Sequence, residues 1–184
     1  MPISAVFLDR DGVLNPHIPG GYLQSADALV VLPGVAWAVR RLNNARLPVI
    51  LISNQQGVGK GLMSLADLSA IEARMAEALA HEAGAWLDRC YYSTELASQN
   101  SPRRKPGPGM LLEAARDFNL TLADTVFAGD SPTDIAAGLA AGVGATVLLL
   151  SGGIRAYTPG DFEPAPDFVF PDLPQFVDWI LENQ

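Results

Sequence analysis

Two aspartates follow an apolar segment near the start of the chain. Asp9 and Asp11 come directly after residues 4–8, and Gly12 lets the chain turn away there without a Cβ in the way. Side chains two residues apart on an extended strand point to the same side, so both carboxylates can face one site. That geometry suits catalysis. An acidic turn that only ends a strand is the alternative, because Asp and Gly are also favoured in turns.

A second acidic group follows another apolar segment. Asp130 comes after residues 125–128 and one glycine, and Asp134 stands four residues further on. Asp130 could join Asp9 around a hard divalent cation, because Mg²⁺ is bound by a few carboxylates together with water and phosphate oxygens. Asp134 could support that ligand or lie in the first turn of a helix. Helix capping by Asp130 or Ser131 is the alternative for this segment.

A serine follows the most apolar segment of the chain. Ser53 comes directly after residues 49–52, and its hydroxyl could donate to a phosphate oxygen beside the backbone N–H groups of the turn. Residues 57–61, Gly-Val-Gly-Lys-Gly, superficially suggest a nucleotide-binding P-loop. However, Gly61 stands where that motif needs Ser or Thr, and Asn54 replaces its first Gly. The sequence therefore does not predict a P-loop.

The densest positive charge lies at residues 103–105, Arg-Arg-Lys, in a chain whose formal net charge is −8. A lysine there could offset phosphate charge, and an arginine could grip a phosphate or a hydroxyl-rich substrate through paired N–H donors. A solvated basic loop is the alternative. The overall negative charge argues against nucleic acid as a partner. An anionic ligand would therefore need a metal site and a few local cations.

Taken in order, these four segments resemble the haloacid dehalogenase-like (HAD) superfamily, and the resemblance spans essentially the whole chain. It implies the α/β fold of that superfamily, a Rossmann-like, doubly wound and mainly parallel sheet. Paired aspartates in the first motif favour a phosphatase, because dehalogenases of the family lack the second Asp. The matching motifs are Asp9-x-Asp11-Gly12, Ser53, Lys105 and Gly129-Asp130-x3-Asp134.

The resemblance implies a role for each of these residues around one phosphate, in a magnesium-dependent phosphomonoesterase. Asp9 would be the nucleophile that forms an aspartyl-phosphate, and Asp11 would be the general acid and base. Ser53 and Lys105 would bind the phosphate. The implied cofactor is Mg²⁺, and its implied ligands are Asp9, Asp11 and Asp130.

Finer detail resembles one branch, the D-glycero-D-manno-heptose-1,7-bisphosphate 7-phosphatases and the related histidinol-phosphatases. Residues 59–61, followed by a helix, look more like the heptose enzymes. The implied reaction removes the 7-phosphate of a small phosphorylated sugar. Histidinol phosphate, another small sugar phosphate, or an inactive phosphate-binding module are the alternatives. The matching segments are residues 7–12, 32–34, 53–57 and 104–110, and the implied substrate contacts are Gly20, Gly21, Tyr22, Ser53, Asn54, Gln55, Gln56, Arg104 and Lys105.

Many relatives in this branch bind a structural zinc through Cys and His just before the Arg-Lys-Pro segment. Residues 92–103 contain neither Cys nor His, so no zinc is expected here. Cys90 precedes this loop and is expected to be a small buried residue of its strand. His17 and His81 are expected to lie in a loop and on a helix face.

The elements that must position these groups alternate along the chain. Short apolar runs and longer amphipathic stretches follow one another, as in βαβ units around a parallel sheet. The clearest helix covers residues 64–83, where Ser64 and Asp67 give a capping-box-like start. Strands are predicted near residues 4–8, 49–52, 86–92, 125–128, 145–150 and 168–170, and further helices near residues 35–44, 110–118, 133–141 and 174–183.

The segments between these elements predict an open site. Two irregular connections, residues 15–33 and 93–109, are long enough to carry function. No stretch after Asp11 or Ser53 is long enough for an inserted cap domain. Residues 152–171, which are rich in Pro, are expected to wrap the surface.

Length and composition favour a single domain, residues 1–184, in the cytoplasm. With 184 residues and 49% hydrophobic composition, the chain can bury one sizeable core. It has no apolar run near the ~18 residues that span a bilayer, and its start lacks the basic region of a signal peptide, so no membrane partner is expected. Its single Cys suits a reducing compartment. The sequence leaves the oligomeric state open, and a monomer is allowed.

Overall fold

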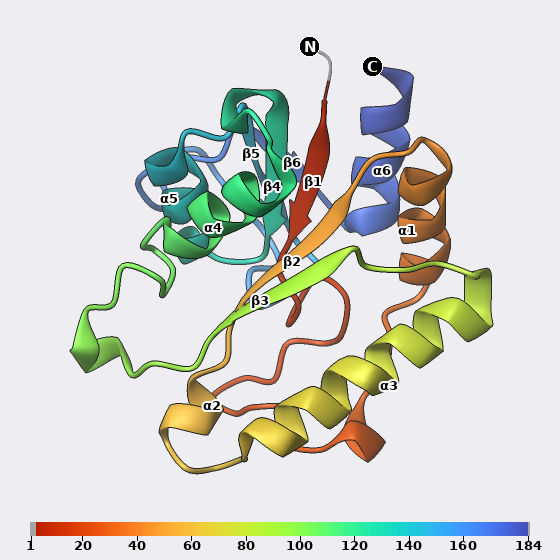
Figure 1. The fold of residues 1–184 in the computed structure, drawn as a ribbon. Coiled ribbons are helices and arrows are strands. Elements are labelled where there is room, and N and C mark those ends of the chain that lie inside the picture. The colour runs from red at the N-terminus through yellow and green to blue at the C-terminus, as the bar shows by residue number, and fades with distance from the viewer. Residues whose placement is uncertain (1–2, 184) are drawn as a thin grey trace.

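The structure is a computed structural model that describes residues 3–183. Its strands are β1 (Ala5–Leu8), β2 (Val49–Asn54), β3 (Arg89–Ser93), β4 (Thr125–Gly129), β5 (Ala145–Leu149) and β6 (Phe168–Phe170). They form one six-stranded, all-parallel sheet in the order β3-β2-β1-β4-β5-β6 (Figure 1). The doubly wound parallel sheet expected from the sequence is confirmed. Residues 1, 2 and 184 of the expected domain lie outside the described part of the chain.

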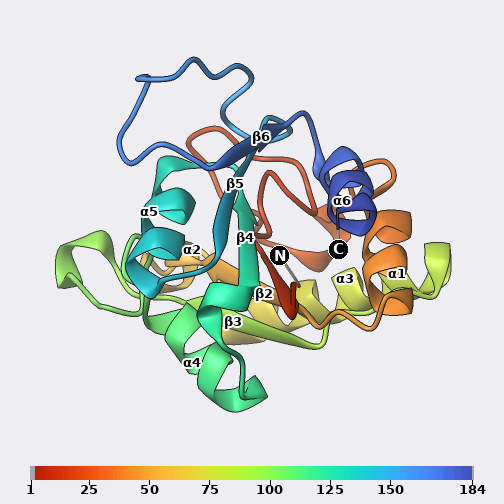
Figure 2. The same ribbon diagram turned by 90° about the horizontal axis from the view of Figure 1, so that it is seen from above.

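Helices cover both faces of this sheet (Figures 1 and 2). Their bounds are α1 (Val35–Asn44), α2 (Gln56–Gly59), α3 (Leu65–Ala83), α4 (Gly109–Phe118), α5 (Pro132–Ala141) and α6 (Leu173–Glu182). Helices α1, α3 and α6 pack on one face, and α4 and α5 pack on the other. The sequence did not predict α2 or the short 3-10 helices at Ala26–Ala28, Ala97–Gln99 and Leu122–Asp124.

The two packed faces follow from the alternation of side chains along the strands. In β1, Val6 and Leu8 join the apolar cluster beneath α1, α3 and α6, whereas Phe7 joins the cluster beneath α4 and α5. Both β1 and β2 are buried on both faces of the sheet, which explains why their sequences are nearly continuous apolar runs. The residues that follow these strands are therefore held at the edge of a well-packed core.

Helix α3 begins with the capping box that the sequence predicts. The backbone N–H of Asp67 donates to Ser64 Oγ at 3.1 Å, and the backbone N–H of Ser64 donates to Asp67 Oδ2 at 2.7 Å. Its buried residues, at three- and four-residue spacing, are Leu68, Ile71, Met75 and Leu79. Neither α3 nor any other helix within residues 3–183 is long and apolar enough to cross a membrane.

Strand β3 starts later than the sequence predicts, at Arg89 rather than near Trp86. The backbone N–H of Trp86 donates to the side chain of Asn43 in α1 at 3.0 Å instead of to a neighbouring strand. The carboxylate of Asp88 accepts from the backbone N–H of Val49 at 2.7 Å. Side-chain hydrogen bonds of Asn43 and Asp88, together with the backbone bond from Asp88 N–H to Val49 O at 2.8 Å, therefore hold the residues that precede β3.

A crevice for ligands opens beyond the carboxyl end of β1. Strands β2 and β4 lie on opposite sides of β1. The connections that follow β1 and β4 therefore diverge to opposite faces of the sheet, which leaves a crevice between them. The connection from β1 to α1 holds only one 3-10 turn, and β2 leads through α2 directly into α3. No cap domain is inserted at either place, as the sequence predicts.

Candidate active site

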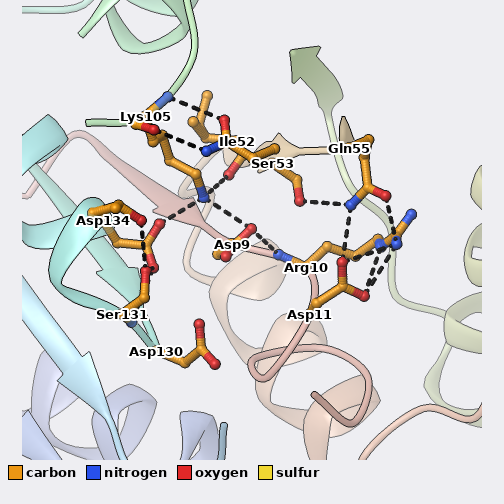
Figure 3. Close-up of polar contacts among 12 residues, drawn as sticks. Asp9, Arg10, Asp11, Ile52, Ser53, Gln55, Lys105, Asp130, Ser131 and Asp134 are labelled. Atoms are coloured by element: carbon orange, nitrogen blue, oxygen red, sulfur yellow. Dashed lines mark hydrogen bonds and ion pairs between the residues drawn. The ribbon is translucent and has the colours of Figure 1, made fainter. Parts of the chain in front are cut away.

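Three carboxylates meet beyond the carboxyl ends of β1 and β4 (Figure 3). Asp9 follows β1, Asp130 follows β4, and Asp134 lies in the first turn of α5. One oxygen of each lies within 4.8 Å of the others, and all three side chains are buried. Two of these aspartates belong to the metal set implied by the sequence, and Asp134 joins them.

The backbone packs tightly against Asp130. A Cβ at Gly12 would lie 2.2 Å from Asp130 Oδ2, and one at Gly152 would lie 2.0 Å from the same atom. Gly153 donates its backbone N–H to this oxygen at 2.9 Å. The expectation that residues 152–171 only wrap the surface is therefore wrong at the start of that segment. The parallel pairing of β5 with β4 brings Gly152 and Gly153 to the site.

Lys105 is buried among these carboxylates and is only 3% exposed. Its Nζ lies 2.6 Å from Asp134 Oδ1, 3.0 Å from Asp9 Oδ1 and 2.9 Å from the backbone oxygen of Ile52. Burial disfavours the ammonium charge, but Asp134 and Asp9 more than offset this, so the pKa of Lys105 lies above its ordinary value. The lysine is thus a fixed positive charge at the centre of the site.

One lysine does not balance the three carboxylates. Burial, partly countered by Lys105, together with the charges of Asp134 and Asp11, raises the pKa of Asp9 to about 6. Burial and the charges of Asp9 and Asp134 raise the pKa of Asp130 to about 7. A divalent cation would relieve this repulsion, and an all-oxygen set of carboxylates suits Mg²⁺. Asp9 and Asp130 therefore fit the implied magnesium ion. Asp134 lies within reach of the same position, but Lys105 contacts its Oδ1 at 2.6 Å and Ser131 donates to its Oδ2, so it supports the other two.

Affinity for Mg²⁺ is expected to fall as the pH is lowered from about 8 to about 6. In the metal-free protein, protons occupy Asp130 below a pH of about 7 and Asp9 nearer 6, and the cation must displace them. Isothermal titration calorimetry in buffers of different ionisation enthalpy measures both the affinity and the released protons. An affinity that stays constant over this range, without proton release, contradicts the ligand assignment.

The side chain of Asp11 is held apart from the three converging carboxylates. Its Oδ1 accepts from Asn15 Nδ2 at 2.8 Å, and its Oδ2 accepts from Gln55 Nε2 at 2.9 Å. The Arg10 guanidinium contacts both oxygens, at 3.0 and 2.9 Å. In this arrangement the Asp11 carboxylate does not point to the metal cluster, unlike the implied ligand set. Asp11 still lines the same cavity, with its side chain 30% exposed.

The segment after β2 ties the serine motif to the lysine motif. Ser53 lines the cavity, as the sequence predicts for a phosphate contact. The side-chain amide of Asn54 donates to the backbone oxygen of Lys105 and accepts from its backbone N–H, both at 3.0 Å. Gln55, in contrast, is buried and is not part of the cavity wall, although its amide donates to Asp11 and Ser53 in that wall. Asn54 therefore fixes the backbone position from which the Lys105 side chain enters the site.

The rim of the cavity comes from the loop between β1 and α1. Gly21 and Tyr22 line the cavity, whereas Gly20 does not. The Tyr22 hydroxyl donates to Gln56 Oε1 at 3.3 Å and accepts from Lys60 Nζ at 2.9 Å. Of the predicted rim contacts, the structure thus brings Tyr22 and Gln56 together at the mouth of the site.

Residues 93–104 are organised around the carboxylate of Glu95. It accepts from the hydroxyls of Ser93 and Ser101, the latter at 2.8 Å, and these two bonds lower the pKa of Glu95. The guanidinium of Arg104 approaches the backbone oxygen of Glu95 at 3.4 Å. Polar contacts of this kind give the loop a defined shape. Arg104, an implied substrate contact, lines a hollow on this loop beside Lys105 and not the cavity that holds the aspartates.

The cavity at this site is smaller than another one in the molecule. A cavity of about 540 Å³ lies at the opposite end of the strands, beside α6, and has mainly apolar walls. The cavity at the carboxylates measures about 200 Å³. Its wall contains the charged side chains that could bind and react with a ligand, so we place the active site there. Its walls are Asp9, Asp11, His17, Ile18, Gly21, Tyr22, Leu23, Ser53, Asn54, Lys105, Asp130, Ser131 and Thr133.

Sequence reasoning missed the residues that hold the aspartates. Arg10 is 1% exposed, and its backbone N–H donates to Asp9 Oδ1 at 2.7 Å. His17 lies in a loop, as predicted, but its Nδ1 is 3.5 Å from Asp130 Oδ2. The role of Arg10 could have been predicted. A charged side chain directly after a buried strand needs a buried partner, and Arg10 stands between two aspartates. No local pattern pointed to His17 or Asn15.

The fold and the four motif segments together define a class of hydrolase. A model of the haloacid dehalogenase-like hydrolases matches residues 3–142, and the chain belongs to this family. The D-glycero-D-manno-heptose-1,7-bisphosphate 7-phosphatase of Thermosynechococcus vestitus is 39% identical, over 100% of this chain and 98% of that protein. The D-glycero-beta-D-manno-heptose-1,7-bisphosphate 7-phosphatase of Escherichia coli K12 is 34% identical, over 95% of this chain and 94% of that protein.

A solved structure supports the same relationship. The D,D-heptose bisphosphate phosphatase of Bordetella bronchiseptica, complexed with magnesium and phosphate, is 33% identical to this chain. The alignment covers 100% of both chains with a TM-score of 0.91. The resemblance to the heptose bisphosphate branch of the family, first seen in the motifs, is confirmed.

Proposed function

We propose that this chain is a magnesium-dependent phosphomonoesterase of a single HAD-like domain, residues 1–184. It removes the 7-phosphate of D-glycero-D-manno-heptose 1,7-bisphosphate through an aspartyl-phosphate. The observation that carries the proposal is the placement of Asp9. Its carboxylate lies 3.0 Å from Lys105 Nζ and converges with the carboxylates of Asp130 and Asp134, in a cavity at the carboxyl end of β1.

The residues divide the reaction into two displacements at phosphorus. Asp9 attacks the phosphorus atom, the bond to the sugar oxygen breaks, and Asp11 gives that oxygen a proton. Asp11 then takes a proton from the water that attacks the aspartyl-phosphate, which releases phosphate and regenerates Asp9. Lys105 and Ser53 bind the phosphoryl oxygens throughout. Asp9 and Asp130, supported by Asp134, would hold the magnesium ion, which would supply positive charge against the repulsion between the Asp9 carboxylate and the phosphoryl group.

The choice of substrate rests on the relatives and on the shape of the site. Relatives that cover nearly the whole chain are heptose bisphosphate phosphatases. The absence of a cap domain leaves the cavity open to the exposed phosphate of a small sugar. Tyr22 lines the cavity, and Arg104 lines a hollow on the other side of Lys105, from which it would have to turn to contact the rest of the substrate. Because the residues of the site come from one chain, a monomer suffices, and the proposed location is the cytoplasm without a nucleic acid or membrane partner.

Turnover of the heptose bisphosphate is expected to exceed that of histidinol phosphate and of other small sugar phosphates by at least about tenfold in kcat/KM. The reason is that only the bisphosphate offers a second anionic group to the basic segment around Arg104. A phosphate-release assay with Mg²⁺ over this set of esters measures it. Equal, poor rates on all of them contradict the substrate, and no release from any ester would favour an inactive phosphate-binding module.

Excess chelator is expected to lower phosphate release to less than about one hundredth, and Mg²⁺ alone is expected to restore it fully. The reason is the repulsion among Asp9, Asp130 and Asp134, which Lys105 relieves only in part and a bound divalent cation would offset further. Activity after dialysis against chelator and re-addition of Mg²⁺, with Zn²⁺ alone as the control, measures this. A requirement for Zn²⁺ in addition to Mg²⁺ contradicts the proposed cofactor.

A further inference from the structure

Gln55 lies beside the candidate phosphate-binding serine but does not face the cavity. It is 1% exposed and is not part of the cavity wall. The resemblance implied that Gln55 contacts the substrate, yet its side-chain amide contacts protein groups at both ends (Figure 3). Gln55 therefore acts on its neighbours rather than directly on a ligand.

The partners of Gln55 fix the direction of its amide. The guanidinium of Arg10, which can only donate, contacts Gln55 Oε1 at 2.9 Å. On the other side, Gln55 Nε2 donates to Asp11 Oδ2 at 2.9 Å and to Ser53 Oγ at 3.0 Å. The reversed amide would set oxygen against the Asp11 carboxylate and N–H groups against the guanidinium. Only one orientation is compatible with these neighbours, and it uses both N–H groups as donors.

This orientation decides what the Ser53 hydroxyl can do. A serine hydroxyl has one proton and two acceptor lone pairs, and the N–H of Gln55 occupies one lone pair. Within residues 3–183 the Ser53 side chain makes no other hydrogen bond, and it lines the cavity. The proton of Ser53 is therefore available to the cavity, where a phosphoryl oxygen is an acceptor.

We propose that Gln55 is a positioning residue that keeps Ser53 as a hydrogen-bond donor to the phosphoryl group and, with its second N–H, holds the carboxylate of Asp11. The inference rests on the proposed phosphomonoesterase function. One amide connects the group that binds phosphate to the group that transfers protons. The buried guanidinium of Arg10 donates to the oxygen of this amide and also to the Asp11 carboxylate. The same hydrogen-bond network therefore fixes the positions of both Ser53 and Asp11.

Gln55→Glu tests the proposal with little change in shape. A glutamate keeps the acceptor for Arg10 but replaces the N–H donors by an oxygen, which would accept the Ser53 proton and repel Asp11. Inorganic phosphate, measured by calorimetry with Mg²⁺ present, is expected to bind roughly tenfold to a hundredfold more weakly, and kcat is expected to fall. Gln175→Glu, the same substitution at an exposed position of α6, is the control and should leave both values unchanged.

Gln55→Met separates positioning from support of the fold. Methionine keeps the length of the side chain but neither accepts from Arg10 nor contacts Ser53, so the hydroxyl is free to rotate. We expect only a few-fold loss of phosphate affinity, less than for Gln55→Glu. A purely structural role predicts the opposite order, because methionine deprives the buried guanidinium of Arg10 of a partner whereas glutamate retains it. The opposite order would overturn the proposal.

Combining Gln55→Glu with Ser53→Ala separates two effects on phosphate affinity. One is the changed orientation of the Ser53 hydroxyl, and the other is the negative charge that the glutamate adds. In the Ser53→Ala background the effect of Gln55→Glu on phosphate affinity is expected to shrink to a few-fold. An equal effect in both backgrounds would mean charge repulsion alone and would overturn the proposal. Turnover of the heptose bisphosphate by the unmodified protein is measured alongside. No turnover with intact phosphate binding contradicts the proposed function but not the role of Gln55, and no phosphate binding contradicts both.

Discussion

Asp9→Asn is expected to lower phosphate release at least about 10⁴-fold, because an amide cannot form the acyl phosphate. The fold should survive. The substitution removes a carboxylate whose burial is unfavourable, as its raised pKa shows, and Lys105 keeps Asp134 as its partner at 2.6 Å. The measurement is kcat with the heptose bisphosphate, together with the midpoint of thermal unfolding.

Asp27→Asn is the matched control for that variant. Asp27 lies in the exposed 3-10 helix Ala26–Ala28, outside the cavity wall, so the same change of group should leave kcat unaltered. A loss of less than about tenfold for Asp9→Asn, with the fold intact, would mean that another group or a water molecule attacks phosphorus.

Lys105→Met is expected to produce the second large effect, on stability as well as on activity. It leaves the carboxylates of Asp9 and Asp134 buried without their cation, which destabilises the fold by about 3–5 kcal/mol. Loss of the charge that binds the phosphoryl oxygens lowers kcat by about 10²–10³-fold. Denaturant unfolding measures the first effect, and turnover well below the unfolding temperature measures the second.

Two comparisons make the result for Lys105→Met specific. Lys60→Met removes the only other lysine of the chain, which is exposed and contacts Tyr22, and should change the free energy of unfolding by no more than about 1 kcal/mol. Mg²⁺ should recover part of the stability of Lys105→Met, because the cation binds the same carboxylates. An unfolding free energy equal to that of the unmodified protein would contradict the central ion-pair role of Lys105.

The position of the site could be predicted from the sequence because its residues follow apolar runs. The carboxyl ends of β1, β2 and β4 are adjacent in a parallel sheet, so Asp9, Ser53 and Asp130 had to come together once the strands were recognised. Lys105 was harder to place by local pattern. It reaches the site through the hydrogen bonds of Asn54, which lies 51 positions earlier in the chain.

What the sequence could not supply is the direction in which side chains point. Asp11 was expected to reach the metal and Gln55 the substrate, yet both side chains contact Arg10, whose burial no periodicity predicts. Gly152 is at the site only because β5 pairs with β4 and ends there. Contacts of this kind depend on strand order and on long-range hydrogen bonds, which residue spacing along the chain does not record.

Trapping the covalent intermediate tests the central claim most directly. In Asp11→Asn the water that releases phosphate is no longer activated, while an aryl phosphate with a good leaving group needs no proton to react. Acid quenching of this mixture with Mg²⁺, followed by peptide mass spectrometry, should find one phosphoryl group on Asp9 and none in the variant that also carries Asp9→Asn. A phosphoryl group on any other residue, or full turnover of the aryl phosphate without a trapped intermediate, would contradict the account.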